Sequence, residues 1–264
     1  VWGTKPYPYD KTEDGVPVEY YECLNEAELL QSFVNWWSAE ENMPDIITGW
    51  NSRFFDIPYL LNRVVRVLGE NEARRFSPWG QIHQKKINVM HREQLAYDIV
   101  GVQQLDYMDL FKKFGYKYGN QESYRLGHVS QVVLGDTKVD YSDLGSLKNM
   151  YENDYRRFVD YNVVDVNLLE RMEDKTGFIN LVQTMAYLGG VNYSDTLGTV
   201  AIWDSIIYRR LAKQKIAIPP NQNSSKTSFA GGYVKDPHIG MHDWTLSFDL
   251  NSLYPHLMMQ YNLS

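Results

Sequence analysis

Short apolar runs that suit buried strands alternate along this chain with longer segments in which apolar residues recur every three or four positions. The helical spacing occurs in three segments, Glu26 to Trp37, Pro58 to Leu68 and Ser146 to Met172. The run from Asp45 to Trp50 suits a buried strand, and Leu105 to Phe111 is expected to form another. This order is typical of an α/β layered domain, which we expect to end near Gly177.

The rest of the chain adds a hairpin and a second region. Between Lys85 and Gln104, β-branched and polar residues alternate loosely, as in a β-hairpin. Phe178 to Lys213 has a helical pattern, and the polar run Pro219 to Ser225 is the best candidate for a linker between domains. Beyond the linker, Trp244 to Leu250 is expected to form a strand, followed by an apolar segment rich in Leu and Met.

Composition limits the classes of protein to consider. With 44% apolar and 14% aromatic residues, the chain can bury a substantial core. A single cysteine, Cys23, rules out an internal disulfide, and no apolar run approaches the length that spans a bilayer. We therefore expect a soluble intracellular protein with no membrane partner. The net charge of −7 weighs against binding a duplex by phosphate neutralisation, but metal-binding carboxylates would still allow a nuclease.

The first candidate site lies between a buried strand and a helix, where α/β folds place ligands. It is the segment from Asn51 to Pro58, in which Asp56 could hold a divalent cation and Asn51 could reach the same pocket. Asp56 could equally be the N-cap of a helix that starts at Pro58. The local pattern favours neither role, and one carboxylate can serve both.

A second candidate pairs a phenol with a carboxylate. Tyr161 and Asp165 are four positions apart, so on a helix they share a face. A tyrosine hydroxyl beside a metal-binding carboxylate could orient or deprotonate an attacking water. Taken alone, the pattern is more typical of an amphipathic helix with a core tyrosine and a solvated aspartate.

The third candidate is the segment from Ser247 to Pro255. Here Asp249 ends the expected strand, and the turn after it contains Asn251 and Ser252. The carboxylate could bind metal while turn amides hold a triphosphate. An ordinary strand-to-helix connection, with Asp249 hydrogen-bonded to its own turn, would give the same pattern.

Other polar residues give weaker signals. Asp106 and Asp109 lie in the expected strand from Leu105 to Phe111, and at least one of them is expected to be structural. The six histidines are scattered, and His238 and His242 have no third ligand at a suitable spacing. A zinc site is therefore not expected.

Together and in this order, the three candidate segments resemble the signature motifs of the family B DNA polymerases. Asn51 to Asp56 resembles the second motif of the proofreading exonuclease, an Asn followed by Phe-Asp, and Tyr161 to Asp165 resembles the third, Tyr-x-x-x-Asp. Asp249 to Pro255 resembles polymerase motif A, Asp-x-x-Ser-Leu-Tyr-Pro. Ser228 to Gly232 resembles the Tyr-x-Gly-Gly element that links the two functions, with Phe229 in place of its tyrosine.

The likeness continues between the motifs from about Glu19 onward, and is greatest to the T-even-type bacteriophage members of the family. The family's exonuclease also needs an Asp-x-Glu in an early strand, and its palm needs an Asp-Thr-Asp; neither occurs in this sequence. The chain begins with Val1 and ends at Ser264 without a tail, so we expect an interior fragment with these motifs upstream and downstream. His256 stands where a small hydroxyl residue is common.

The resemblance implies an α/β fold in three parts. Residues 1–177 would form a ribonuclease-H-like 3′→5′ exonuclease domain, a mixed sheet flanked by helices, without the strand that carries Asp-x-Glu. Residues 178–220 would be a helical connecting segment. Residues 221–264 would be the beginning of an α+β polymerase palm with motif A.

In the exonuclease, the resemblance implies two Mg²⁺ or Mn²⁺ ions with Asp56 and Asp165 among their ligands, and a Tyr161 that positions the attacking water. Asn51 and Phe55 would contact DNA, with Phe55 or neighbouring aromatics stacking on a single-stranded primer end.

In the palm, the resemblance implies that Asp249 binds both catalytic ions and that the Leu250 carbonyl binds one of them. The contacts to the incoming nucleotide would come from Ser252, Leu253 and Tyr254. Tyr254 would lie under the sugar as a barrier to a 2′-hydroxyl. Gly231 and Gly232 would contact DNA.

The whole protein would then be a viral replicative DNA polymerase that acts on primer-template DNA and dNTPs in the cytoplasm of an infected bacterium. It would bind a sliding clamp and other replisome proteins through parts outside this chain. The chain alone, with only some of the metal ligands, is expected to be inactive. Two alternatives stay open: a free-standing ribonuclease-H-like nuclease, which would not need the segment after Gly232, and a non-catalytic nucleic-acid-binding domain whose carboxylates cap helices.

Overall fold

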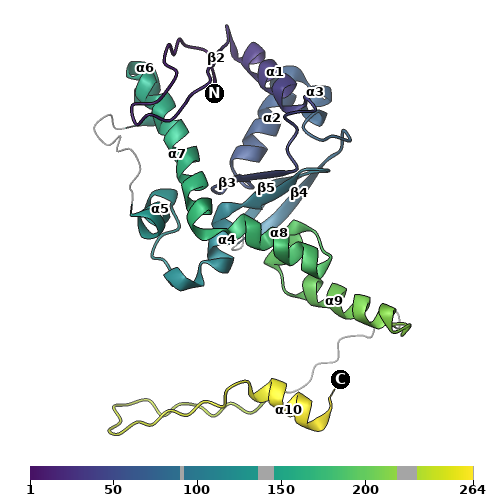
Figure 1. Ribbon diagram of the computed structural model, residues 1–264. Helices are drawn as coiled ribbons and strands as arrows, with labels where there is room; N and C mark the ends of the chain where they lie inside the picture. Colours follow the sequence, from purple (N-terminus) through teal and green to yellow (C-terminus); the bar gives the residue numbers. More distant parts are fainter. Residues whose placement is uncertain (90–91, 136–145, 219–230, 264) are drawn as a thin grey trace. The chain divides into compact units, whose positions relative to one another are not determined.

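The chain divides into two units by its internal contacts, one over residues 1–218 and one over residues 219–264. The computed structural model describes residues 1–89, 92–135, 146–218 and 231–263 (Figure 1). The linker predicted at residues 219–225 and the Phe229 position lie outside the described residues. Each unit is therefore described by itself.

Two short parallel strands position the segments that matter most in the first unit. β3 (Ile46–Gly49) pairs with β6 (Gln103–Asp106), and Gly49 lies opposite Asp106. The Thr48 hydroxyl donates a hydrogen bond to the Leu105 carbonyl at 2.7 Å. Because parallel strands end at the same edge of a sheet, the segments that follow β3 and β6 start beside each other.

Three helices build one hydrophobic core: α1 (Glu26–Trp37), α2 (Asp56–Leu68) and α3 (Glu70–Arg74). Asn25 caps α1, since its side chain accepts a hydrogen bond from the Glu28 N–H at 3.0 Å. An ion pair between Arg63 and Glu26 joins α2 to α1. Most of its buried side chains come from these helices, among them Leu30, Val34, Leu61, Val64 and Ala73, and Ile99 comes from the strand before β6.

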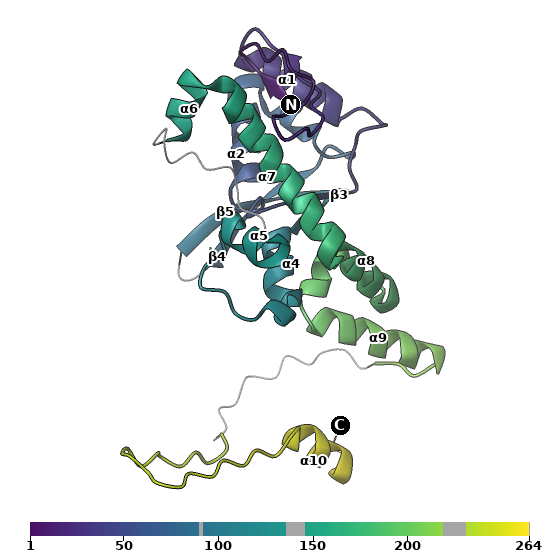
Figure 2. The ribbon, with the colours of Figure 1, turned by 60° about the vertical axis from the view of Figure 1, so that its left-hand side comes forward.

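A second core joins β6 to four helices: α4 (Tyr107–Phe114), α5 (Leu126–Leu134), α7 (Tyr155–Thr176) and α8 (Phe178–Gly189). Figure 2 shows α7 passing close to α5, with α8 continuing beyond its end. Its buried residues include Leu105, Tyr107, Leu110, Phe111, Val129, Met172, Phe178 and Val182. The start of the expected connecting segment at residue 178 is thus part of this core.

The remaining strands pair two by two. β4 (Ile82–Val89) and β5 (Arg92–Ile99) are antiparallel, which confirms the predicted hairpin. Near the N-terminus, β1 (Trp2–Gly3) pairs in parallel with β2 (Tyr21–Glu22). Parallel and antiparallel pairs are therefore combined with helices, as in a mixed α/β domain.

The N-terminal segment also contacts α7. Tyr7, Val18 and Val159 are buried together in a third, smaller core. The Tyr7 hydroxyl donates a hydrogen bond to the Asp160 carboxylate at 2.6 Å. Burial and this bond raise the pKa of Tyr7 well above its ordinary value.

Three predicted elements differ from the structure. The strand expected over Leu105 to Phe111 is wrong beyond Asp106, where α4 begins. The helix expected over Ser146 to Met172 is two helices, α6 (Leu147–Asn153) and α7, separated at Asp154. The stretch from Phe178 to Lys213 breaks at Gly190 (φ +65) into α8, the 3₁₀ turn η3 (Tyr193–Leu197) and α9 (Val200–Lys213).

The second unit contains one helix among its described residues, α10 (Leu253–Tyr261). The strand expected over Trp244 to Leu250 is not formed, and the segment is exposed. A strand needs a neighbour to pair its backbone N–H and C=O groups, and residues 231–263 contain no other strand. In the part of the chain that the structure describes, no helix combines the length and apolar character needed to cross a membrane.

Candidate functional site

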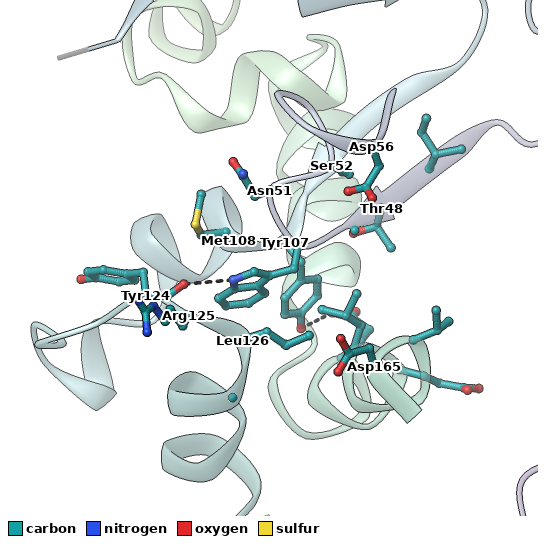
Figure 3. A pocket seen from close by; sticks show the side chains of 18 of the residues that line it. Thr48, Asn51, Ser52, Asp56, Tyr107, Met108, Tyr124, Arg125, Leu126 and Asp165 are labelled. Carbon is teal, nitrogen blue, oxygen red and sulfur yellow. Dashed lines mark hydrogen bonds between the residues drawn. The ribbon is translucent and has the colours of Figure 1, made fainter. Parts of the chain in front are cut away.

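A pocket of about 1410 Å³ opens in the first unit where the carboxyl ends of β3 and β6 meet α7. One wall is the end of β3, the turn after it and the first residues of α2. A second is one face of α7, and a third is the segment 123–128 that leads into α5. Figure 3 shows Asp56 and Asp165 on one side of this space and Tyr124 and Arg125 on the other.

Asp56 is the first residue of α2, and the N-cap position before it belongs to Phe55. The alternative that Asp56 is an N-cap is therefore wrong. The residue is exposed, yet nearby protein displaces water from its carboxyl and raises its pKa, while a hydrogen bond from its own backbone N–H opposes the shift. Within the described residues, no cation contributes to this shift. A carboxylate that the fold desolvates in this way is typical of a functional site.

Tyr161 and Asp165 lie one turn apart on α7, and both half-buried side chains line the pocket. The structure thus brings Asp56, Tyr161 and Asp165 to one cavity, although α2 and α7 are far apart in the sequence. It does not show what they bind, so their roles remain predictions.

The other two residues predicted to contact DNA in this unit differ in position. Asn51 lines the pocket and has a left-handed backbone conformation (φ +61). Phe55 is 67% exposed and is not among the pocket-lining residues. Stacking of Phe55 on a primer end would have to take place outside the pocket as it stands.

Sequence reasoning missed the wall formed by residues 123–128. Trp50 connects this wall to β3, because its indole N–H donates a hydrogen bond to the Tyr124 carbonyl at 3.0 Å. Arg125 is exposed, and it is the one lysine or arginine among the described residues that line the pocket. The available signal was Tyr124-Arg125, an aromatic followed by a cation just before a helix.

For Asp106, the sequence predicted at most a structural role. Its carboxylate accepts hydrogen bonds from the backbone N–H groups of Asn51 (3.0 Å), Arg53 (3.1 Å) and Met108 (3.0 Å). The expectation that at least one of Asp106 and Asp109 is structural is thus met by Asp106. Burial raises the pKa of Asp106, and the bonds from Arg53 and Asn51 oppose the shift.

The carboxylates of Asp56 and Asp165 are ligands of the kind that divalent cations prefer. They are two, however, and no cluster of three or more His, Cys, Asp or Glu side chains suited to a metal ion occurs in the described parts of the chain. Further acids, Glu170, Glu173 and Asp174, line the pocket on α7. Glu173 is engaged by the buried Tyr107, whose hydroxyl donates to its carboxylate at 2.9 Å. The residues present therefore fit part of a divalent-metal site.

The predicted palm residues all belong to the second unit. Asp249 and Leu250 precede α10, and Ser252 is its N-cap, with a left-handed backbone (φ +53). Leu253 and Tyr254 form the first turn, and Gly231 and Gly232 stand at the start of the described part of this unit. All of these residues are exposed. The structure does not bring them into a pocket with one another, and their roles remain predictions.

Comparison with known proteins gives a consistent result over both units. The family model "DNA polymerase family B, exonuclease domain" matches residues 4–129, and the model "DNA polymerase family B" matches residues 200–264. The two matches together take in more than half of the chain.

Individual relatives agree with the family models. The chain is 37% identical over 257 residues to the DNA-directed DNA polymerase of Enterobacteria phage T4 and 35% identical to that of Escherichia phage RB69, covering 95% of this chain and 28% of each relative. It is 32% identical to the DNA polymerase delta catalytic subunit of Candida albicans, over 83% of this chain and 22% of that protein. The chain thus spans about 28% of the length of its phage relatives. The chain belongs to the family B DNA polymerases, with residues 4–129 similar to their exonuclease domain and residues 200–264 similar to their polymerase model.

Proposed function

We propose that the whole protein is a replicative DNA-directed DNA polymerase whose first unit here is a proofreading 3′→5′ exonuclease. The proposal rests on one observation: Asp56, Tyr161 and Asp165 line the same pocket. The similarity to phage polymerases over 95% of the chain supports it. A free-standing nuclease would not need residues 200–264, which match the polymerase model.

The proposed reaction is hydrolysis of the last phosphodiester of a single-stranded 3′ end. Asp56 and Asp165 would hold divalent ions, Mg²⁺ or Mn²⁺, two per site, together with an upstream Asp-x-Glu pair of the whole protein. Such ions would supply a more acidic water and a positive charge for the leaving 3′ oxygen. Within this chain, the Tyr161 hydroxyl would orient the water, and Asn51 and Phe55 would contact the DNA. We infer a ribonuclease-H-like fold for this domain from the family.

The pocket also suits a strand of DNA by its charge pattern. Its α7 side is acidic, and Arg125, on the facing wall, would contact a phosphate. Aromatic rings of Trp50 and Tyr124 line the same side, where an unpaired base could stack. A single strand could thus lie between a cationic, aromatic wall and a wall of metal-binding carboxylates.

For the second unit we propose the start of a polymerase palm over residues 221–264. Asp249 and the Leu250 carbonyl would bind catalytic ions, and Ser252, Leu253 and Tyr254 would contact the incoming dNTP. Gly231 and Gly232 would contact primer-template DNA. The same proposal places the enzyme in the cytoplasm of an infected bacterium, with a sliding clamp and other replisome proteins as partners through other regions.

The test uses the full-length polymerase with a 3′-labelled oligonucleotide and with a primed template. Asp165→Ala should abolish Mg²⁺-dependent removal of 3′ nucleotides and leave primer extension intact, while Asp249→Ala should do the reverse. Loss of both activities in either variant, with the protein still folded, would contradict the assignment of two separate sites.

The 264-residue chain alone should have neither activity. Two carboxylates cannot readily hold two divalent ions against hydration, because multidentate carboxylate coordination is what offsets the loss of bound water. The measurement is release of label from a 3′-labelled oligonucleotide with Mg²⁺ or with EDTA. Mg²⁺-dependent release by the chain that is absent from its Asp165→Ala variant would mean that the site is complete as it stands.

A further inference from the structure

Asp106 is the last residue of β6, and it is only 4% exposed. Its two carboxylate oxygens are used differently. Oδ1 accepts hydrogen bonds from the N–H groups of Met108 and Asn51, both at 3.0 Å. Oδ2 accepts one from the Arg53 N–H at 3.1 Å.

The bond to Met108 is an ordinary helix cap, because it satisfies a free N–H in the first turn of α4. A cap needs one oxygen, which a serine, threonine or asparagine supplies as well. The bonds to Asn51 and Arg53 have a different purpose, since these residues belong to the turn that follows β3. Oδ1 serves the cap and Asn51 together, and the second acceptor-only oxygen of a carboxylate is needed to hold Arg53 as well.

The turn that Asp106 holds is tight and strained. Asn51 has φ +61, a conformation that is uncommon for residues other than glycine. The turn also folds back closely on β3: a Cβ added to Gly49 would lie 2.7 Å from the Ser52 Cβ. A strained turn persists only where surrounding contacts fix it, and the bonds from Asp106 are such contacts.

The same turn determines where Asp56 stands. The Asn51 carbonyl accepts a hydrogen bond from the Phe55 N–H at 3.2 Å, and the Ser52 carbonyl accepts one from the Ile57 N–H at 3.0 Å. These two bonds fix the residues on either side of Asp56. A shift of the turn would therefore move the Asp56 carboxylate, although Asp106 itself is not among the residues that line the pocket.

We propose that Asp106 is a positioning residue of the exonuclease, which fixes the Asp56 carboxylate in the pocket through the turn from Asn51 to Phe55. The proposal rests on the exonuclease function proposed above. It assigns to Asp106 an effect on the reaction rate and on the metal dependence, in addition to its effect on the stability of α4.

The test is Asp106→Asn in the full-length polymerase. The amide matches the carboxylate in shape and keeps one acceptor oxygen. With that oxygen on the cap side, its NH₂ group faces the N–H of Arg53; with the amide turned over, it faces the N–H groups of Met108 and Asn51. The exonuclease kcat should fall by about 10- to 100-fold, as expected for a small misplacement of a catalytic group. The Mg²⁺ concentration for half-maximal rate should rise. The KM for a single-stranded oligonucleotide and the rate of primer extension should stay unchanged.

Two further variants separate positioning from folding. Asp106→Ser keeps a one-oxygen cap for Met108 but cannot reach Arg53, so it should show the same kinetic defect. Asn25→Ala removes the cap of α1, away from the pocket, and should lower the thermal midpoint without changing the exonuclease kcat or its Mg²⁺ dependence.

Three outcomes would overturn the proposal or its basis. Folded Asp106 variants with the wild-type kcat and Mg²⁺ dependence would show that the residue is only a cap. Failure of both variants to fold would show that Asp106 is required for the fold and not for the site. If the wild-type enzyme and Asp165→Ala released nucleotides equally, the exonuclease function itself would be wrong, whatever the Asp106 variants do.

Discussion

Asp56 in the first turn of α2 and Asp165 in the middle of α7 line the same pocket, and Tyr161 lines it one turn before Asp165. The two carboxylates belong to elements that are joined through the long segment containing the β4–β5 hairpin, α4 and α5. Their meeting is therefore a property of the tertiary fold. Because the three side chains share one pocket, substitutions can test whether the Tyr161 phenol orients water while the two carboxylates bind metal.

Tyr161→Phe in the full-length enzyme should slow the exonuclease by less than about 100-fold, because the hydroxyl would orient the water without taking its proton, and positioned proton transfer itself contributes roughly 100-fold or more. Its metal affinity should be nearly unchanged, because the carboxylates remain. Asp165→Ala should cost about 1000-fold, the effect of losing several kcal/mol of charge stabilisation. The measurements are single-turnover hydrolysis and Mg²⁺ titration, with Tyr208→Phe on exposed α9 as the control. An equal loss of metal affinity in both pocket variants would make Tyr161 a ligand or a structural residue.

Asp56→Asn should stabilise the fold at neutral pH. The pKa of Asp56 is raised above the ordinary 3.8 in the folded chain. As the pH rises from 3.8 to that higher value, the unfolded carboxyl loses its proton first, so the free energy of unfolding of the wild type falls. The neutral amide avoids this loss. Urea unfolding of both proteins at several pH values, without metal ions, measures the difference. The difference in the free energy of unfolding between variant and wild type should be smallest in acid and largest above the pKa of Asp56 in the folded chain. A difference that grew on acidification would contradict the desolvation of the Asp56 carboxylate.

Phe111→Ala should destabilise the first unit by about 3–5 kcal/mol, as for other buried aromatic residues. Phe111 is 2% exposed, and its ring contacts Trp50, Tyr118, Tyr124 and Phe178. Denaturant unfolding would measure the loss. Tyr116→Ala, at a side chain that is 87% exposed in the turn η1 (Tyr116–Tyr118), should change stability by no more than about 0.5 kcal/mol. Similar losses in the two variants would mean that the aromatic cluster does not hold the core together.

Tyr254→Ala should let the full-length polymerase incorporate ribonucleotides much more readily. The expectation depends on Tyr254 lying under the sugar of the incoming nucleotide, where a 2′-hydroxyl would meet its ring. The ratio of incorporation efficiencies for dNTP and rNTP gives the answer. Tyr261→Ala, at the other end of α10, should leave the ratio unchanged. Unaltered discrimination in the Tyr254 variant would exclude the steric role.

Elements with strong periodic patterns could be predicted from the sequence. The first helix was expected over the same residues that α1 occupies, and Pro58 at the third position of α2 is compatible with the first turn of a helix. The strand β3 and the β4–β5 hairpin were also found. In each case the side chains within the segment itself carried the information.

The failures depend on contacts that a local pattern does not contain. Leu105 to Phe111 is a short segment whose pattern fits a strand or a helix equally. The strand gives way to a helix at Asp106 because the Asp106 side chain caps α4 by accepting from the Met108 N–H. Trp244 to Leu250 has strand-like residues but no partner strand in the described part of its unit. At the site, the motifs indicated Asp56, Tyr161 and Asp165. The contributions of Arg125 and Asp106 could be identified only from the tertiary structure, in which β3, β6 and α5 lie together.

The distribution of the pocket along the chain also bears on how the protein is made. The walls formed by β3 and α2 leave the ribosome long before α7, and Leu105 and Phe111 share their core with Met172 and Val182. Until α7 and α8 have been synthesised, that core lacks Met172, Phe178 and Val182, and the pocket lacks Tyr161 and Asp165. Contacts between such distant segments form late and slowly. A nascent chain would therefore lack two residues of the proposed site, and its exposed apolar surface would make it prone to aggregation at this stage of synthesis.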